Sequence, residues 1–445
     1  MHFHSIWAFA QNKTEIDSSP PFPGGFFVAP TPGPVRRISS PRVTFRRSAP
    51  SLLVEAIAGE ALVRTEVRTR SEVLEIGVIA PEEYHPLADI HGGRSFLQVA
   101  SWADVKTEWS SELLAWRDSD GSAVGTTLVL YRRLPGVSRW YAYLPEGPDI
   151  DWADPRLERW LDPLLEHLDR RQVFAVRLGP PAVLKRWQAS TLKNSVRRGR
   201  RVDDVLPDVV EPVGSSVAER LRDLGWSRGG EEGTGGDAQP RYLFQVPISG
   251  RTPAELWAGL SKEWKRNIQK AEKSGIEIRQ GTESDLPAFF ELLQTTEHRN
   301  GFRLGRSLAY YQRQYRVMNA ERPGRMRLYL STWHGEVLAA HTMNVVGRRV
   351  WYQSGASANH HRDVRPSHIL QWRMMTDAQQ LGADRYDMRG VSDSLDPEDR
   401  AFGLLRWKLG TGGELVQTVG EWERALPGPI NQLLLRAMTR YRTRG

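Results

Sequence analysis

Apolar positions along the chain alternate or recur at helical spacing in two stretches that share one order of elements. In each stretch, alternation of apolar and polar residues predicts three strands joined by a tight turn and a short turn. A segment with helical periodicity follows, and a further strand comes after it. The first copy occupies residues 113–147, 154–171 and 174–181, and the second occupies residues 328–357, 368–382 and 385–390. Because the order and the turns agree, the sequence predicts a duplicated domain.

The repeated order of strands and helix is typical of N-acetyltransferase (GNAT) domains, in which a central sheet splays open to admit an acyl donor and an amine. We therefore expect an α/β (α+β) protein with two tandem GNAT-like domains. The predicted first domain covers residues 71–245 and the second covers residues 246–417. Residues 418–445 form a C-terminal segment that can pack back on the first domain.

Residues 1–70 differ in composition from the rest of the chain. The stretches PPFPGG, APTPGPVRR and RRISSPRVTFRRSAPS are rich in Pro, Gly and Arg. Such sequence cannot bury enough apolar surface to offset the entropy of the chain, so we expect a disordered N-terminal segment.

The 445-residue chain has no cysteine and a formal net charge of +8. The lack of cysteine excludes disulfides, thiolate nucleophiles and cysteine-based zinc sites. The positive charge either serves solubility or favours an anionic partner, such as a nucleic acid, a phosphorylated precursor or an acidic membrane surface. No run approaches the roughly 20 apolar residues that a membrane helix needs. We expect a cytoplasmic protein, with peripheral contact to the inner membrane face left open.

The loop that binds the CoA pyrophosphate in GNAT enzymes lacks its glycines here. In the second copy it reads NHHRDVRPSHILQW, where Arg362 and Arg365 are present but Pro366 removes a backbone donor. In the first copy the corresponding loop, GPDIDWADPRL, is acidic. The adjacent His360 and His361 do not share a helix face, and no Walker or Ser-His-Asp motif occurs. We therefore expect no cofactor and no metal.

Four segments together resemble one family of enzymes. They are SFLQVASWADVKTEW from Ser95, ELWAGLSKEWKRNIQKAEKSGIEIR from Glu255, FFELLQTTEHRNGFRLGRSLAYYQ from Phe289, and GADRYDMRGVSDSLDPEDRAFGLLRWKLGTGGELVQTVGEWE from Gly382. They are similar to the Fem (FemABX) family of peptidoglycan bridge-forming aminoacyltransferases, of the lipid II:glycine glycyltransferase type. The resemblance covers nearly everything from about residue 80 to residue 425.

The resemblance implies a tRNA-dependent aminoacyltransferase of EC 2.3.2 type. Its donor would be an aminoacyl-tRNA, with glycine as the first choice of amino acid. Its acceptor would be the stem peptide of a lipid-linked or nucleotide-linked muramyl-pentapeptide, and DNA is not an expected partner. Some family members carry a long coiled-coil arm, but KAEKSGIEIRQGTESDLPAFF runs on without a heptad insert, so we expect no arm.

Aminolysis of an ester needs positive charge near the developing oxyanion, a route for the amine's proton and close positioning. Lys408, in RWKLGTGGE, resembles an essential lysine of the family, which implies a role at the acyl ester or the terminal ribose. The alternative is an exposed lysine at a strand end. Glu421, in VGEWE, resembles a family carboxylate that orients the amine or receives a proton. Gly179 stands where the family more often has Asp, and Glu421 is a candidate to replace that carboxylate.

Three further residues resemble the family's phosphate-binding positions. Lys106, in WADVKTEW, resembles a lysine that contacts the phosphate of the precursor. Arg306 and Tyr310, in RSLAY, resemble a phosphate-binding arginine and its tyrosine neighbour, while GFRLGR offers Arg303 as a second choice. Arginine suits bidentate phosphate contact and lysine acts as a point charge. The alternative for each cation is a solvated surface charge.

Two strand residues and one helix complete the predicted site. Tyr352, in VWYQSG, either lines the cleft or belongs to the core, and Asp387, in YDMRG, lies where a cleft would open. The predicted helix ELWAGLSKEWKRNIQKAEKSG carries Lys262, Arg266 and Lys270, which can contact tRNA phosphates without reading bases. A solvated helix face is the alternative.

Two other functions fit the same residues, namely a CoA-dependent N-acyltransferase of a small amine and a non-catalytic tRNA-binding protein. The sequence leaves open the donor amino acid, the carrier of the acceptor and the position of the added residue in the bridge. It also leaves open the oligomeric state and the role of residues 1–70.

Overall fold

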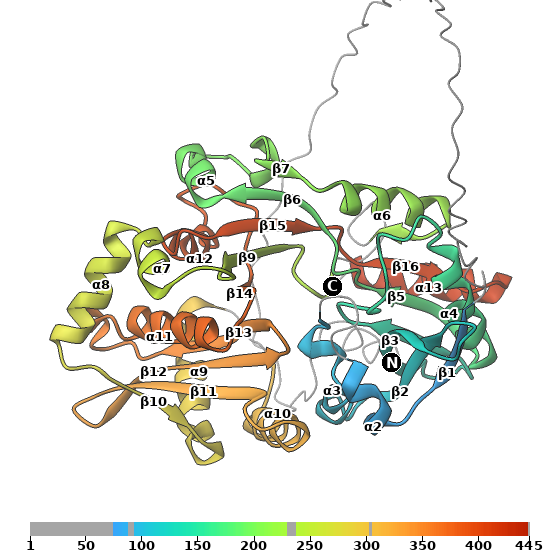
Figure 1. The fold of residues 1–445 in the computed structure, drawn as a ribbon, viewed down its shortest axis with the longest axis horizontal. Helices are drawn as coiled ribbons and strands as arrows, with labels where there is room; N and C mark the ends of the chain where they lie inside the picture. Colours follow the sequence, from blue (N-terminus) through green and yellow to red (C-terminus); the bar gives the residue numbers. More distant parts are fainter. Residues whose placement is uncertain (1–73, 88–92, 229–236, 302–304, 444–445) are drawn as a thin grey trace, which may run out of the picture. The chain divides into compact units, whose positions relative to one another are not determined.

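Two mixed sheets hold the repeated elements, and they lie side by side (Figure 1). The computed structural model describes residues 74–87, 93–228, 237–301 and 305–443, all within one compact unit. The predicted N-terminal segment 1–70 and Arg303 lie outside the described residues.

The first sheet has seven strands, in the spatial order β1-β2-β3-β4-β5-β16-β8. Its strands are β1 (Glu75–Val78), β2 (Ser110–Arg117), β3 (Ala123–Arg133), β4 (Trp140–Leu144), β5 (Val173–Leu178), β16 (Trp422–Ala425) and β8 (Ser227–Arg228). The second sheet has nine strands, in the order β10-β11-β12-β13-β14-β9-β15-β6-β7. Its strands are β10 (Glu277–Gly281), β11 (Met326–Trp333), β12 (Glu336–Val346), β13 (Arg349–Ser357), β14 (Arg385–Gly390), β9 (Tyr242–Pro247), β15 (Glu414–Thr418), β6 (Val183–Gln188) and β7 (Val209–Val210).

The predicted repeat is confirmed strand by strand. In the first copy β2, β3 and β4 pair antiparallel, helix α4 (Glu158–Arg170) crosses over, and β5 returns parallel to β4. In the second copy β11, β12 and β13 pair antiparallel, α11 (Pro366–Gln380) crosses over, and β14 returns parallel to β13. This order, with a parallel pair at the point where the helix crosses, is that of the predicted GNAT-like fold.

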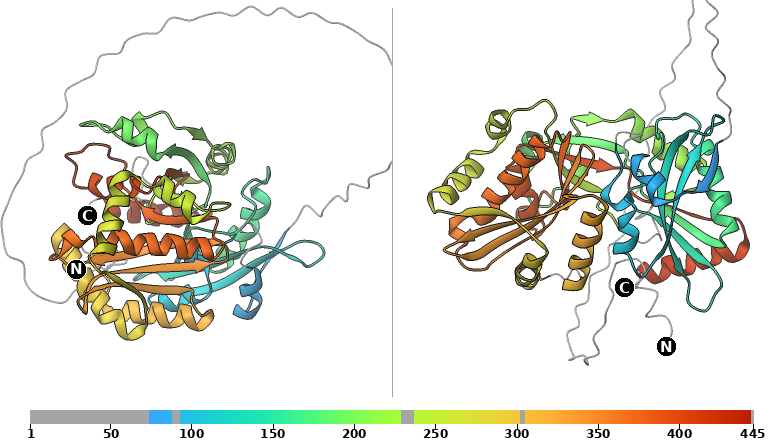
Figure 2. Two further views of the ribbon diagram at one scale, coloured as in Figure 1. Left: turned by 60° about the vertical axis from the view of Figure 1, so that its left-hand side comes forward. Right: turned by 60° about the horizontal axis from the view of Figure 1, so that its bottom comes forward.

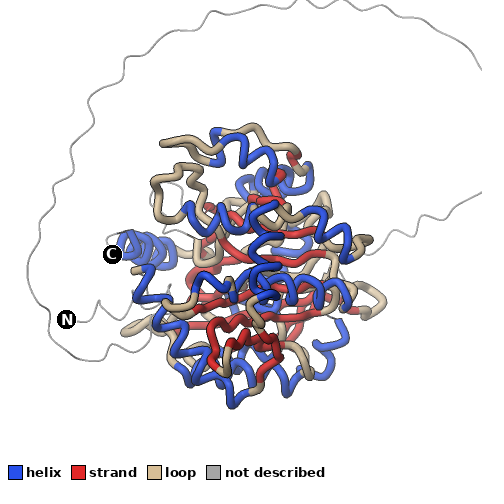
Figure 3. The backbone as a smooth tube through the Cα atoms, turned by 90° about the vertical axis from the view of Figure 1, so that its left-hand side faces the viewer, coloured by secondary structure: helices blue, strands red, loops and turns tan. Residues whose placement is uncertain are grey.

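Helices cover both faces of the second sheet (Figure 3). Successive side chains of a strand point to opposite faces. Tyr329 therefore packs into the core beneath α8 (Lys262–Lys273) and α11, whereas Leu328 and Leu330 pack into the core beneath α9 (Leu286–Asn300) and α10 (Leu308–Glu321). The remaining helices are α2 (Pro81–Tyr84), α3 (Ser101–Val105), α5 (Ala189–Ser195), α6 (Pro212–Asp223), α7 (Pro253–Gly259), α12 (Phe402–Leu409) and α13 (Pro429–Thr443).

Two of these helices show ordinary capping residues at their ends. Helix α7 begins with a capping box in which Thr252 and Glu255 bond to each other's backbone N–H. Helix α9 ends at Gly301, whose φ of 68° suits a residue without a side chain. Helix α8 leads through residues 274–276 directly into β10, so the expected lack of an arm at this point is confirmed.

The chain passes repeatedly between the two sheets. Strands β6 and β7 follow the first repeat in sequence but belong to the second sheet, while β16 follows the second repeat but pairs with β5 of the first sheet. Helix α13 then contacts β5, and Met438 joins a core cluster with Tyr141 and Phe174. Each sheet is therefore completed by strands from the other half of the chain.

A shared apolar core joins the two repeats. It contains Phe96, Trp102 and Leu128 from the first half of the chain and Phe289 and Trp351 from the second. Helix α3 packs against α10 across this junction, as two views of the ribbon show (Figure 1, Figure 2). None of the described helices has the length and apolar character needed to cross a bilayer.

Candidate functional site

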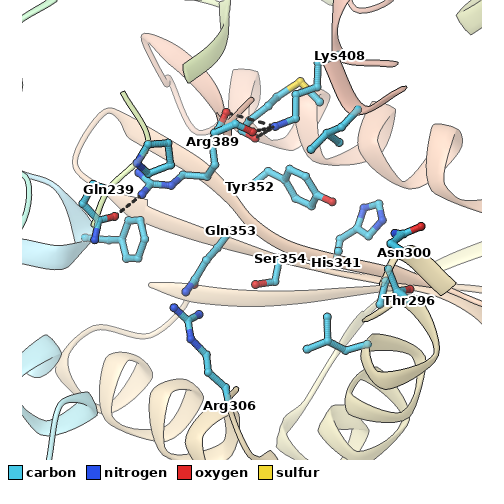
Figure 4. Close-up of a pocket in the computed structure, with 18 of the residues that line it drawn as sticks. Gln239, Thr296, Asn300, Arg306, His341, Tyr352, Gln353, Ser354, Arg389 and Lys408 are labelled. Carbon is cyan, nitrogen blue, oxygen red and sulfur yellow. Dashed lines mark hydrogen bonds between the residues drawn. The ribbon is translucent and has the colours of Figure 1, made fainter. Parts of the chain in front are cut away.

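A cavity of about 1270 Å³ is lined by residues of both repeats. Strand β13 supplies its floor with Tyr352, Gln353 and Ser354, while Arg306 and Lys408 approach from opposite sides (Figure 4). Among the described residues of the lining, Asp237 is the only carboxylate. Its cationic side chains are those of Lys106, Arg177, Arg299, Arg306, Arg362, Arg365, Arg389, Arg400 and Lys408. A wall of this charge suits anionic ligands.

Lys408 lies in the last turn of α12, and its side chain is buried. Its ammonium donates hydrogen bonds to three backbone carbonyl oxygens at the end of β14, those of Met388 (2.6 Å), Gly390 (2.8 Å) and Arg389 (3.3 Å). Burial lowers the pKa of Lys408 to about 7, and Asp387 partly opposes that effect. In its ammonium form Lys408 uses all three N–H groups in these bonds. The lysine is thus neither exposed nor at a strand end.

Arg389 is a wall residue that the sequence did not single out. Its φ of 62° lies in the left-handed region, which is unusual for a residue with a side chain. Its guanidinium donates to a carboxylate oxygen of Glu146 (2.6 Å) and to the side-chain oxygen of Gln239 (3.0 Å). The carbonyl contacts of Lys408 hold the backbone on either side of Arg389. This ion pair links the end of β14 to the loop after β4.

Glu421 lies behind the cavity wall rather than in it. Its carboxylate accepts hydrogen bonds from the hydroxyl of Tyr143 (2.6 Å), the backbone N–H of Ala238 (2.6 Å) and the guanidinium of Arg177 (3.4 Å). Burial raises the pKa of Glu421, and Arg177 opposes that effect. Tyr143 and Arg177 themselves line the cavity, so Glu421 reaches a ligand through them.

Gly179 stands next to Glu421 at the end of β5. A Cβ atom built at Gly179 would lie 3.6 Å from Cγ of Glu421 and 3.2 Å from the backbone nitrogen of Glu146. A side chain at this position would therefore begin in van der Waals contact with the side chain of Glu421.

Lys106 and Arg306 share one aromatic ring at another part of the cavity wall. The Lys106 ammonium lies 5.6 Å and the Arg306 guanidinium carbon 5.0 Å from the ring centre of Tyr310. Burial lowers the pKa of Lys106 to about 7, and the neighbouring Arg306 lowers it further, while Glu108 at 4.0 Å opposes both. Arg306 disfavours the charged form of Lys106, and a bound anion would relieve that repulsion. The structure thus brings Lys106, Arg306 and Tyr310 together as the sequence predicted.

Two models of known families match the chain at this site. The model described as the FemAB family matches residues 79–321, more than half of the chain. The chain belongs to the FemAB family. A model described as an acetyltransferase (GNAT) domain matches residues 259–408, which contain the second repeat.

Relatives of this FemAB protein are similar over most of its length. A lipid II:glycine glycyltransferase of Staphylococcus haemolyticus is 23% identical over 424 residues, which is 80% of this chain and 94% of that protein. One from Staphylococcus aureus strain USA300 is 22% identical over 425 residues, with the same coverage. A crystal structure of FemX is 21% identical, has a TM-score of 0.67, and covers 81% of this chain and 100% of its own. That structural likeness supports the fold.

Tyr352 of this FemAB protein lines the cavity floor, as Figure 4 shows. Its ring centre lies 5.2 Å from that of His341, whose pKa burial lowers to about 3. Gly355 leaves the space that the Tyr352 hydroxyl fills, since a Cβ there would lie 2.0 Å from that oxygen. Asp387 is buried and is not part of the cavity lining; its carboxylate accepts hydrogen bonds from the side chain of Gln245 (3.0 Å) and the backbone N–H of Arg389 (2.6 Å).

The proposed tRNA-binding residues lie on a helix surface outside the cavity wall. Lys262, Arg266 and Lys270 are exposed on α8, while Trp264 and Asn267 on the other face of the helix are buried. The basic face is therefore accessible to a large ligand.

One group of described residues has side chains close enough to hold a metal ion. It consists of Glu336, His360 and His361, all exposed, with Nε2 of His360 2.6 Å from a Glu336 oxygen. The group is not part of the cavity lining. Exposed clusters of this kind also occur without a metal.

Proposed function

We propose that this FemAB protein transfers an amino acid, glycine in the first instance, from an aminoacyl-tRNA to the stem peptide of a peptidoglycan precursor. The observation that carries the proposal is the cationic cavity lined by both repeats, in a chain whose relatives are named lipid II:glycine glycyltransferases. Both substrates are polyanions, which such a wall suits. Because aminoacyl-tRNA is made in the cytoplasm, the protein acts there, at or near the inner membrane face.

The reaction joins the attacking amine to the ester carbon and breaks the bond from that carbon to the ribose oxygen of the tRNA, which takes up a proton from water. Lys408 supplies positive charge where the carbonyl oxygen becomes an oxyanion, and its three carbonyl contacts fix it in place beforehand. The ammonium acts through its charge, since its three N–H groups bond to those carbonyl oxygens. A preorganised electrostatic group of this kind contributes about 10²–10³ in rate. The ester is already activated, so no side-chain nucleophile is required.

The amine must lose a proton as the new amide bond forms. Tyr143 lines the cavity, and its hydroxyl donates to Glu421, whose pKa is raised by burial. We assign the proton path to this pair: the amine proton passes to the Tyr143 oxygen as the hydroxyl proton passes to Glu421. The carboxylate is thereby the acceptor without touching the substrate.

The acceptor is held by its phosphate groups. Lys106 and Arg306, which share the ring of Tyr310, form the anion site for the diphosphate of the lipid-linked or nucleotide-linked precursor. Tyr352 then borders the peptide on the cavity floor. Asp387 does not contact the substrate but accepts a hydrogen bond from the backbone N–H of Arg389 and so positions that wall residue.

A transfer assay with radiolabelled glycyl-tRNA and the lipid-linked precursor tests the proposal. Wild-type protein should label the precursor, and Lys408→Met should lower the rate about 10²–10³-fold. Lys193→Met, at an exposed position on α5, is the matched control and should retain the wild-type rate.

Three outcomes would count against the proposal. No labelling with glycyl-, alanyl- or seryl-tRNA would refute it, as would full activity of Lys408→Met. Saturable binding of acetyl-CoA by calorimetry, together with acetyl transfer to a small amine, would instead favour a CoA-dependent N-acyltransferase. Mass spectrometry of muropeptides from cells lacking the gene would show which residue is missing from the bridge.

A further inference from the structure

Two arginines of the loop before α11 line the cavity and have no assigned ligand. Arg362 and Arg365 lie at the two ends of a short turn, are exposed, and form no ion pair within the described part of the chain. The backbone of Arg365 has a φ of 62°, in the left-handed region. Solvent-facing guanidinium groups on a cavity wall are suited to phosphate oxygens, which they bind bidentately.

This loop is fixed to the basic helix α8. The ammonium of Lys270 lies 3.6 Å from a carboxylate oxygen of Asp363, in the same turn as Arg362. Within the first turn of α11, Nε2 of His368 lies 3.2 Å from the side-chain nitrogen of Asn267 on α8. The exposed cations of α8 and the two arginines of the cavity wall therefore form one continuous basic surface.

The same loop also leads toward Lys408. The rings of His368 and Trp407 are 6.0 Å apart, and Trp264 packs against both, at 4.9 Å and 5.1 Å. Trp407 and His368 both line the cavity, and Trp407 directly precedes Lys408 in α12. Burial lowers the pKa of His368 to about 4, so the charge along this part of the wall comes from the arginines.

We propose that Arg362 and Arg365 bind the phosphodiester groups of the unpaired 3′ end of the donor tRNA. This inference rests on the proposed function and adds the path of the donor. In this arrangement the base-paired acceptor stem of the tRNA lies on the exposed face of α8. The unpaired 3′ end of the tRNA passes over Arg362 and Arg365, and its terminal aminoacyl ester reaches Lys408. The acceptor phosphates use a separate pair of cations, Lys106 and Arg306, which belong to other elements of the fold.

Salt dependence of RNA binding measures these contacts without requiring turnover. The probe is a fluorescent RNA minihelix with a CCA end, titrated with full-length protein at several salt concentrations. For single-stranded nucleic acid, each phosphate contact contributes about 0.7 to the slope of log affinity against log salt concentration. The double variant Arg362→Gln/Arg365→Gln should therefore bind more weakly and lower the slope by about 1.4.

A chemical change in the RNA provides the matching perturbation. Replacing the last phosphodiesters of the probe with neutral methylphosphonates should weaken wild-type binding to the level of the double variant. The two changes should not add, because they remove the same contacts. Arg373→Gln, in α11 but paired with Asp377 on its own helix, is the control and should bind like the wild type.

The outcomes separate this inference from the proposed function. A double variant with wild-type affinity and slope would overturn the inference, and so would additive effects of the variant and the modified RNA. Transfer by the wild-type protein is measured in parallel, with glycyl-minihelix as donor. Absence of that transfer would defeat the proposed function, whereas the binding slopes would still decide whether these arginines hold the RNA.

Discussion

Replacing Lys408 with methionine should change how the free energy of unfolding depends on pH. The ordinary pKa of lysine, 10.5, applies to the unfolded chain, and burial lowers the pKa in the folded protein to about 7. Between these values the unfolded state binds more protons, so stability rises with pH. The full stability is present above pH 10.5 and is lost as the pH falls toward 7.

The size of the effect follows from the two pKa values. Linkage gives a loss of unfolding free energy, relative to high pH, of about 4 kcal/mol at pH 7 and about 2 kcal/mol at pH 9. The methionine variant has no such titration. The wild-type protein should therefore gain about 2 kcal/mol of unfolding free energy relative to Lys408→Met between pH 7 and pH 9.

Urea unfolding of both proteins at the two pH values measures this gain. Leu404→Met, at a half-exposed position in the same helix, is the control, because it removes no titratable group. The difference in unfolding free energy between Leu404→Met and wild type should be equal at both pH values. If the difference for Lys408→Met were also equal at both, burial would not lower the pKa of Lys408, and the reasoning about its charge would be wrong.

Two further substitutions test the contacts behind the cavity wall. Tyr143→Phe removes the donor of a 2.6 Å bond to the buried Glu421, so the free energy of unfolding should fall by about 1–3 kcal/mol in urea titrations; an unchanged value would contradict the role of this bond. Arg389→Met leaves Glu146 without its partner and should cost about 3–5 kcal/mol, seen as a lower melting temperature. The double variant with Glu146→Gln should recover most of that loss, and a double variant as unstable as the single one would show that the ion pair is not the cause.

The repeat was predictable because its signals are local. Alternation within β11 and β12, the turn at His334 and Gly335, and the periodicity of α11 are all properties of short stretches of sequence. The parallel return of β14 follows once the order of elements is known, since a helix must cross between parallel strands.

Contacts between distant residues were not predictable in the same way. Lys408 gives no local sign of burial, because the carbonyl oxygens that receive its hydrogen bonds belong to another element and are set by the backbone of β14. The same holds for Glu421, which the sequence placed near the acceptor but which lies behind Tyr143. Arg389 carries no motif, and only its left-handed backbone marks it as unusual.

Each sheet contains strands from the other half of the chain, and this exchange affects how substrates enter the cavity. Strand β15 is bonded to β6 and β9, and β16 is bonded to β5, so the segment from β15 to β16 ties one sheet to the other. These ladders lie within one sheet or the other, so a wide hinge movement would have to be taken up by residues 419–421 between β15 and β16, which are buried. We therefore expect both substrates to thread into an aperture of nearly constant width, and we expect neither half of the chain, expressed separately, to yield a stable protein.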